Sequence, residues 1–240
     1  LITYLVALGA LLLIEIPKPA ISEVGLKSRG TIWQETHFGF RYIHERPSLY
    51  GLAVLFMVVN VFLAIGATLL APVVLIETGN SVSALATVQS VGAIGGVFGG
   101  GVLSLSGGPR RRIHGVLLGG IGVCLLGILW LGLSHTIVFL ALGSFFFSFF
   151  WPFMEGNDLA IWQSKVEADV QGRVISARAL MVGLPYHLGT LISGPLGELW
   201  KVANVLIAAG ISGGLVFLFG YISRSIKQVE ILLPDTQNEQ

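Results

Sequence analysis

The sequence has 240 residues, of which 54% are hydrophobic and only 11% are charged. Its mean hydropathy is +0.82. A soluble domain averages about 25% charged residues, so this chain lacks the polar side chains needed to cover a water-facing surface. The composition therefore predicts a membrane protein. A net charge of +1 gives no indication of a nucleic-acid partner, and the lone Cys124 cannot form an internal disulfide.

The first 14 residues, LITYLVALGALLLI, are uncharged. As a helix they would extend about 21 Å at ~1.5 Å per residue, which is too short to cross a membrane. They also lack the basic segment that begins a signal peptide. We therefore expect residues 1–14 to be the end of a transmembrane helix that starts upstream, and the chain to be part of a longer protein.

Residues 15–48 are expected to form a polar linker that contains one amphipathic helix. Two prolines, Pro17 and Pro19, break any helix at its start. Further along, one helical face collects Ile32, Thr36, Phe40 and Ile43, with Trp33 beside them. This pattern predicts a helix lying at the membrane interface. A linker without regular structure is the alternative.

Six further uncharged runs are each about 19 residues or longer, which is enough to cross a membrane as a helix. Strands would instead alternate polar and apolar residues. The predicted fold class is an all-α membrane protein, with a six-helix transmembrane bundle at 49–224 and a tail at 225–240. The runs are 49–76, 81–109, 113–134, 136–154, 179–197 and 202–223.

Basic residues fall almost entirely on one side of this predicted bundle. Of the 14 lysines and arginines, all but Lys201 lie in segments that the count of spans places on the same side of the membrane. These segments are 15–48, 110–112, 155–178 and 224–240. The positive-inside rule makes that side cytoplasmic. We therefore expect the linker and the C-terminus to be cytoplasmic.

Glycines recur at helical spacing in the run 81–109. Gly92, Gly96 and Gly100 are four residues apart, and Gly95 and Gly99 form another such pair. Small residues on one face let two helices approach closely. The pattern predicts a tightly packed helix pair, which either slides during a transport cycle or packs statically.

Several polar residues lie in or beside the spans. Glu155 and Asp158 share one helical face. They are either candidates for transport and proton coupling or a solvated or salt-bridged helix end, paired with Arg110, Arg111 and Arg112 or with Arg173. His187 is either a proton carrier or a neutral core residue. The candidates for lining a cavity are Asn60, Gln89, Asn157 and Tyr186.

The sequence contains no HExxH, GxSxG, P-loop or dinucleotide-binding motif. We therefore expect no enzyme activity, no metal site and no cofactor.

Six spans preceded by a linker with a lateral helix and the end of another span resemble the second half of a major facilitator superfamily transporter. In that fold two six-helix halves are joined by a long linker. The resemblance implies that residues 1–14 end the sixth span and that the rest form spans seven to twelve. It also implies three partners: an N-terminal half, membrane lipid and a small-molecule substrate.

The segment IWQSKVEADVQGRVISAR at 161–178 resembles the loop between spans ten and eleven in the bacterial efflux branch of that superfamily. This branch includes enterobactin exporters and macrolide efflux proteins. SGPLGE at 193–198 resembles the end of its span eleven. The matching loop residues are Gln163, Glu167, Asp169, Gln171, Gly172, Arg173 and Val174.

The same resemblance marks two cytoplasmic loops as candidate gates. One contains Gln163, Gln171, Gly172 and Arg173, and we hypothesise that Arg173 ties this turn to neighbouring helix ends. The other contains Arg110, Arg111 and Arg112, which equally well serve as topology anchors. In the second loop, Leu105 and Ser106 stand where the superfamily signature has an Asp and an Arg, so the sequence departs from that signature.

The expected function is export of small molecules such as drugs, macrolides or siderophores across the bacterial plasma (inner) membrane, driven by protons through alternating access. Three alternatives remain open at this point: an uptake carrier of the same fold, a membrane-embedded enzyme and a bundle that does not transport.

Overall fold

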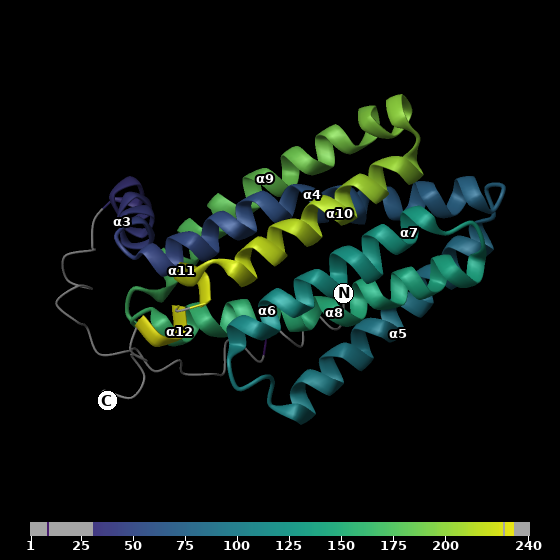
Figure 1. Cartoon of the computed structure of the whole chain (residues 1–240). Helices are drawn as coiled ribbons and strands as arrows, with labels where there is room; N and C mark the ends of the chain where they lie inside the picture. Colours follow the sequence, from purple (N-terminus) through teal and green to yellow (C-terminus); the bar gives the residue numbers. More distant parts are fainter. Residues whose placement is uncertain (1–8, 10–30, 228, 233–240) are drawn as a thin grey trace.

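The structure, a computed structural model, describes residue 9, residues 31–227 and residues 229–232. Within these residues every regular element is helical, and the long helices form an elongated bundle (Figure 1). The elements are α3 (Ile32–His44), α4 (Pro47–Glu77), α5 (Val82–Ser106), α6 (Arg112–Ile121), the π-helix η1 (Gly122–Leu129), α7 (Trp130–Leu133), α8 (Ile137–Lys165), α9 (Gln171–Trp200), α10 (Val202–Ile222), α11 (Arg224–Lys227) and α12 (Val229–Leu232). The predictions for residues 1–14, apart from Gly9, for 15–30 and for the tail from residue 233 lie outside the described residues.

Five of the described helices are long and apolar enough to cross a membrane: α4, α5, the continuous helix Arg112–Leu133, α8 and α10. They match five of the six predicted spans. The sixth prediction, 179–197, falls within α9, which is 30 residues long but does not reach the apolarity of the other five. Polar Tyr186 and His187 and the prolines Pro185 and Pro195 account for this difference. α9 nevertheless runs beside α4 along the bundle (Figure 1).

The polar segment after the fourth predicted span is much more helical than the sequence indicated. We predicted a loop over 155–178, but α8 continues to Lys165 and α9 begins at Gln171. Only residues 166–170 connect the two helices. The charged residues at 155, 158 and 178 therefore lie on helices, and the short turn brings the end of α8 against the start of α9.

Short turns also fix the other antiparallel neighbours. Gly79 and Asn80, both with φ of 63°, reverse the chain after α4, and the Ser81 hydroxyl accepts a hydrogen bond of 3.2 Å from the Ala84 N–H at the start of α5. Lys201 alone separates α9 from α10 and adopts φ of 64°. A lysine in this left-handed region is uncommon, so a one-residue connection imposes backbone strain there.

Two helix pairs dominate the packing. α5 lies against α8, and α4 lies against α9. α10 contacts α4 and the helix Arg112–Leu133, which closes the bundle around a continuous apolar core. The largest side chains in this core include Phe56, Phe217 and Leu63, which are almost completely shielded from solvent.

Glycines make the close contact between α5 and α8, and only some of the glycines in the two predicted series take part. A Cβ atom at Gly95 or Gly99 would overlap the backbone of Phe145 or Phe149 on α8, and Gly92 faces Ser144. Gly96 makes only ordinary contact, and a Cβ at Gly100 would meet nothing within 4 Å. The packing face therefore follows Gly92 and the predicted pair Gly95 and Gly99, whereas Gly96 and Gly100 of the other predicted series do not form the close contact.

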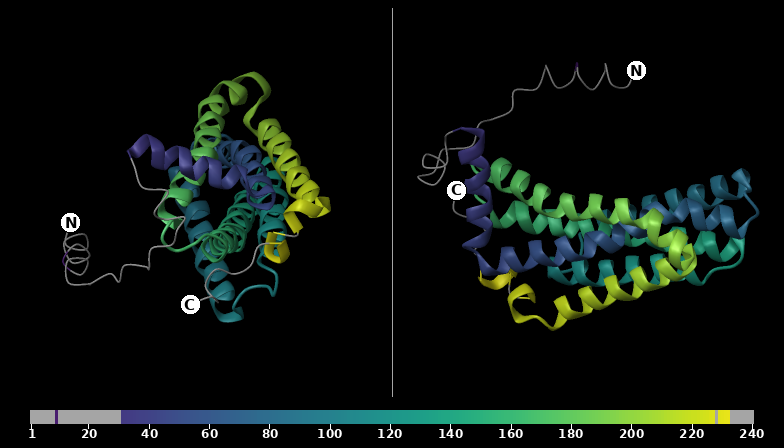
Figure 2. Two further views of the ribbon diagram at one scale, coloured as in Figure 1. Left: turned by 90° about the vertical axis from the view of Figure 1, so that its left-hand side faces the viewer. Right: turned by 90° about the horizontal axis from the view of Figure 1, so that it is seen from above.

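The helix expected in the linker is present as α3, which lies across one end of the bundle (Figure 2). The face that packs against the bundle includes Ile43 of the predicted apolar face, which we expected to lie at the membrane interface. Gly39, Tyr42 and Ile43 are buried, whereas Phe40 and Trp33 are exposed. Gly39 allows close contact, because a Cβ there would lie 2.7 Å from the Arg173 carbonyl oxygen on α9. Burial raises the pKa of Tyr42 above its ordinary value, because the charged phenolate would lose its hydration.

The short C-terminal helix α12 closes the same end of the bundle. The Glu230 carboxylate accepts a hydrogen bond of 2.7 Å from the Arg112 N–H. Its backbone oxygen accepts one of 3.0 Å from Lys165 Nζ. Glu230 thus bridges the start of α6 and the end of α8.

The glycine contact gives a matched pair of variants. Gly99→Ala is expected to lower the free energy of unfolding by about 1–3 kcal/mol, because the added methyl group overlaps the α8 backbone. Gly100→Ala, one residue later in open space, should be neutral or slightly stabilising, since alanine favours helix over glycine. Unfolding of both variants in detergent measures the difference. Equal midpoints would contradict the proposed packing face.

Candidate functional site

A cluster of charged residues is buried where the end of α8 meets the start of α9. Asp158 is completely buried, and Arg178 is 7% exposed. The Arg178 guanidinium forms an ion pair with the Asp158 carboxylate and lies 3.6 Å from Glu155 Oε1 through its Nη2. The Trp162 indole N–H donates a hydrogen bond of 3.3 Å to the other oxygen of Asp158.

Helical spacing explains how these side chains meet. Glu155, Asp158 and Trp162 are separated by three and four residues, so they form one stripe on α8. Arg178 lies in the second turn of α9. Because only residues 166–170 connect the two helices, this turn of α9 lies beside the stripe.

Aromatic rings surround the cation. The Arg178 guanidinium carbon lies 5.6 Å from the centre of the Phe56 ring and 5.7 Å from that of Trp162. Such contacts stabilise a desolvated cation. Its Nε has no hydrogen-bond partner among the described residues. The cluster therefore holds one cation between a buried carboxylate and a second one, Glu155, whose side chain is 43% exposed.

The predicted partners of the two carboxylates were wrong. We expected Glu155 and Asp158 to pair with the arginines at 110–112 or with Arg173. Instead Arg178 pairs with both, while Arg112 Nη1 donates a hydrogen bond of 2.9 Å to the Ala160 carbonyl oxygen. Arg110 and Arg111 are exposed.

Residues of the turn between α8 and α9 stabilise the helix ends. Gln171 Nε2 donates hydrogen bonds of 2.6 Å to the Gln163 carbonyl oxygen and 3.1 Å to that of Val166. These bonds satisfy carbonyls at the end of α8. Arg173 forms an ion pair of 3.4 Å with Glu35 on α3. The hypothesis that Arg173 links this turn to a neighbouring element thus has a specific contact behind it.

His187 and Tyr186 lie apart from the cluster. His187 is nine residues beyond Arg178 on α9, about 13 Å along the axis at ~1.5 Å per residue. The two rings contact each other, with centroids 6.0 Å apart. His187 is exposed on the bundle surface, together with Leu184, Leu188 and Leu191.

The other cavity candidates make local contacts. Asn60 Nδ2 donates to the Phe56 carbonyl oxygen at 2.8 Å, and Asn157 Nδ2 donates to that of Phe153 at 2.7 Å. Asn157 also packs against Gly115 of α6. Gln89 is exposed on α5. Asn60 and Asn157 therefore act as hydrogen-bonded packing residues, whereas the Gln89 side chain is exposed on the outside of the bundle.

Sequence reasoning missed Arg178 and Trp162 as site residues. We assigned Arg178 to a loop because the loop was taken to run to residue 178. A cation two turns into a helix needs a counter-charge in the membrane, and the carboxylates on the preceding helix are the candidates, since the nearer Glu167 and Asp169 belong to the connecting turn. That argument would have found the pair, had the helix limits been correct.

The buried pair gives a stability prediction. Asp158→Asn and Arg178→Gln should each lower the free energy of unfolding by about 3–5 kcal/mol, because each leaves one member of the buried pair without its counter-charge. The double variant should lose less than the sum, since it removes both. Glu155→Gln, at an exposed side chain, should cost about 1 kcal/mol or less.

Denaturant unfolding of the four variants in detergent completes this thermodynamic cycle. Additive losses for Asp158→Asn and Arg178→Gln would show that the two residues do not interact, contrary to the structure.

Comparison with known proteins gives one match. A family model described as Major Facilitator Superfamily matches residues 1–190. No curated protein and no solved structure matches the chain.

Proposed function

Because this chain belongs to the major facilitator superfamily, we propose that it is the C-terminal half of a bacterial inner-membrane exporter that moves small molecules outward in exchange for protons. Members of this superfamily are membrane transporters that work by alternating access, rather than enzymes. The observation that carries the proposal is the cluster of Asp158, Arg178 and Glu155. Ionisable groups in membrane helices are costly and usually serve function.

Charge balance in the cluster supports proton coupling. Two carboxylates face one guanidinium, so the ionised cluster carries a net charge of −1. A proton on either carboxylate removes one of the attractions that hold Arg178. Because Arg178 moves with α9 and both carboxylates move with α8, protonation changes how firmly these helix ends are joined. Glu155 is the more exposed carboxylate, so it exchanges a proton with water more readily than the buried Asp158 does.

Apolar surfaces on α5 and α9 are where we place the N-terminal half. α5 exposes Ile94, Val97 and Phe98, and α9 exposes Leu184, Leu188 and Leu191. His187 lies within the apolar surface of α9. In the assembled transporter, this surface would face the other half and the central cargo path, where His187 is available to contact cargo or carry a second proton.

Orientation follows from the distribution of basic residues. The end of the bundle that carries α3 and the turn at 166–170 is the basic one, and we place it in the cytoplasm. The cluster then lies near the cytoplasmic boundary. Protonation there would control opening toward the cytoplasm, as an exporter needs when it collects cargo from inside the cell.

Transport by the full-length protein tests this proposal. In everted membrane vesicles, uptake of dyes and macrolides is measured with and without a protonophore. Glu155→Gln is expected to reduce the proton-dependent uptake about tenfold or more, because the glutamine stays neutral at any pH. Glu45→Gln is the matched control, since Glu45 lies on α3 in an exposed pair with Arg41.

The outcomes separate the alternatives. Cargo that leaves everted vesicles when a proton gradient is imposed would identify an uptake carrier. Wild-type proton-dependent uptake in Glu155→Gln, with normal membrane insertion, would remove the cluster from the coupling mechanism.

A further inference from the structure

Trp162 contacts both members of the buried ion pair, and the proposed function gives it no role. Its indole N–H donates a hydrogen bond of 3.3 Å to Asp158 Oδ1, and the centre of its ring lies 5.7 Å from the Arg178 guanidinium carbon. Trp162 and Asp158 are both completely shielded from solvent. One buried side chain therefore meets the carboxylate with its N–H and the cation with its ring.

The extension of α8 beyond its apolar run places the indole beside the carboxylate. Trp162 lies four residues after Asp158, so the two side chains share one face of the helix. The Trp162 carbonyl oxygen accepts a hydrogen bond of 3.1 Å from the Val166 N–H, which closes the last turn of α8. The contact between donor and carboxylate therefore depends on α8 staying helical to its end.

The hydrogen bonds at Asp158 match the ionised form of its carboxylate. Oδ1 accepts from Trp162, and Oδ2 pairs with Arg178. Tryptophan and arginine side chains donate hydrogen bonds and do not accept them. A proton on either oxygen would therefore weaken the bond to the donor that faces it.

Two charged groups act on Asp158 within the described residues, Arg178 of α9 and Glu155 of α8. α4 brings the apolar ring of Phe56 beside Arg178. The indole N–H is therefore the neutral polar group through which this site stabilises one charge state of the carboxylate.

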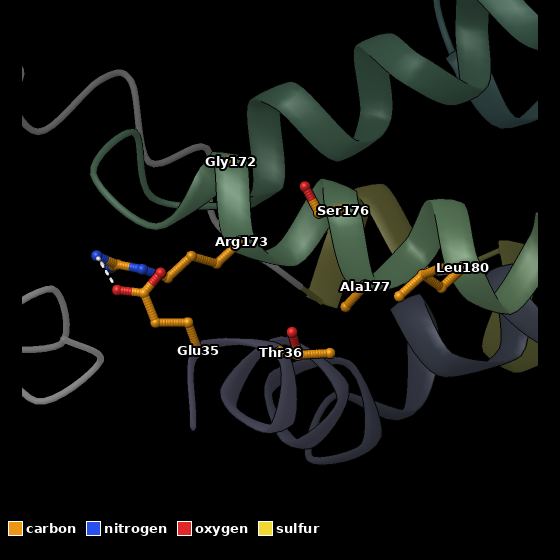
Figure 3. A pocket seen from close by; sticks show the side chains of 7 residues that line it. All are labelled: Glu35, Thr36, Gly172, Arg173, Ser176, Ala177 and Leu180. Carbon is orange, nitrogen blue, oxygen red and sulfur yellow. Dashed lines mark ion pairs between the residues drawn. The ribbon is translucent and has the colours of Figure 1, made fainter. Parts of the chain in front are cut away.

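Other charged groups at this end of the bundle make contacts of their own. Arg112 of α6 donates to a backbone oxygen of α8, and Lys165 of α8 donates to a backbone oxygen of α12. Arg173 of α9 forms an ion pair with Glu35 of α3, where both side chains border an open cavity (Figure 3). Trp162 instead contacts the two members of the buried pair.

We propose that Trp162 is a positioning residue that holds Asp158 in its ionised form and so sets the pH at which the cluster takes up a proton. This inference rests on the proposed proton coupling at the same cluster. A hydrogen bond to a charged acceptor is stronger than one between neutral groups. Loss of the indole N–H therefore weakens the ionised form of Asp158 more than its protonated form.

Packing alone is the competing explanation, because a buried tryptophan usually finds a partner for its N–H. An analogue separates the two explanations. Benzothienylalanine has the shape of tryptophan and carries sulfur in place of the N–H, so at position 162 it keeps the packing and removes the donor. Trp162→Phe removes the same donor with a smaller ring and is the second variant.

Infrared difference spectroscopy on the full-length protein in lipid tests the proposal, with aspartate labelled by ¹³C at its side-chain carboxyl group. The label separates aspartate bands from those of Glu155, and the band that Asp158→Asn removes belongs to Asp158. Either replacement of Trp162 should raise the midpoint pH of this band by about one pH unit, because a hydrogen bond to a charged group is lost. The pH profile of proton-dependent uptake in everted vesicles should shift in the same direction.

Trp151→Phe is the control, because Trp151 also lies on α8 and its ring contacts Phe147, with centroids 5.7 Å apart. Its midpoint pH should equal that of wild type. An unchanged midpoint in both variants at position 162 overturns the role of Trp162 and leaves the exporter proposal standing. A raised midpoint in a protein whose uptake is insensitive to Glu155→Gln supports the role of Trp162 and removes the exporter proposal.

Discussion

The pairing of Arg178 with Asp158 is the interaction on which the rest of this end of the bundle depends. It joins α8 to α9 at a point where both side chains are shielded from water. An isolated charge there would be several kcal/mol too costly, so neither residue can be buried without the other. The five-residue turn at 166–170 and the bonds from Gln171 to the end of α8 hold the helices at the distance that this pair requires.

The first turns of α9 are held on two sides by ion pairs of different strength. Arg178 points into the bundle and meets a buried carboxylate, whereas Arg173, five residues earlier, meets the half-exposed Glu35 on α3. The inner pair responds to protons in our proposal, and it acts on the first turns of α9, the helix whose exposed surface we place at the cargo path.

The features of the fold that the membrane requires of a whole helix, its length and its apolar composition, were predictable from the sequence. A spanning helix must be long and apolar, so the uncharged runs located five of the spans directly. The sixth run, 179–197, lies within α9. Small residues must line a close helix contact, so the glycines of α5 were correctly assigned to packing. Which glycines form the contact was not predictable from spacing, because Gly95 and Gly99 follow the same four-residue pattern as Gly96 and Gly100.

The site was harder to predict, because it depends on where helices end. Charges at 155–178 were read as a loop, since charge usually marks water. In the structure, α8 continues to Lys165 and α9 begins at Gln171, so most of these charged residues lie on helices. Arg178 of α9 then pairs with Asp158 and Glu155 of α8. The π-helix η1 within Arg112–Leu133 also left no sequence signal that we recognised, since its residues are as apolar as those of an α-helical span.

The central claim, that protons act through the cluster at Arg178, is tested most directly by infrared difference spectroscopy on the full-length protein in lipid. Lowering the pH in the absence of cargo should produce the carbonyl band of a protonated carboxylic acid, and adding cargo should change it. Glu155→Gln or Asp158→Asn should remove this band, while Glu45→Gln should leave it. A band that neither cluster variant affects, or no cargo-dependent change at all, would contradict the account.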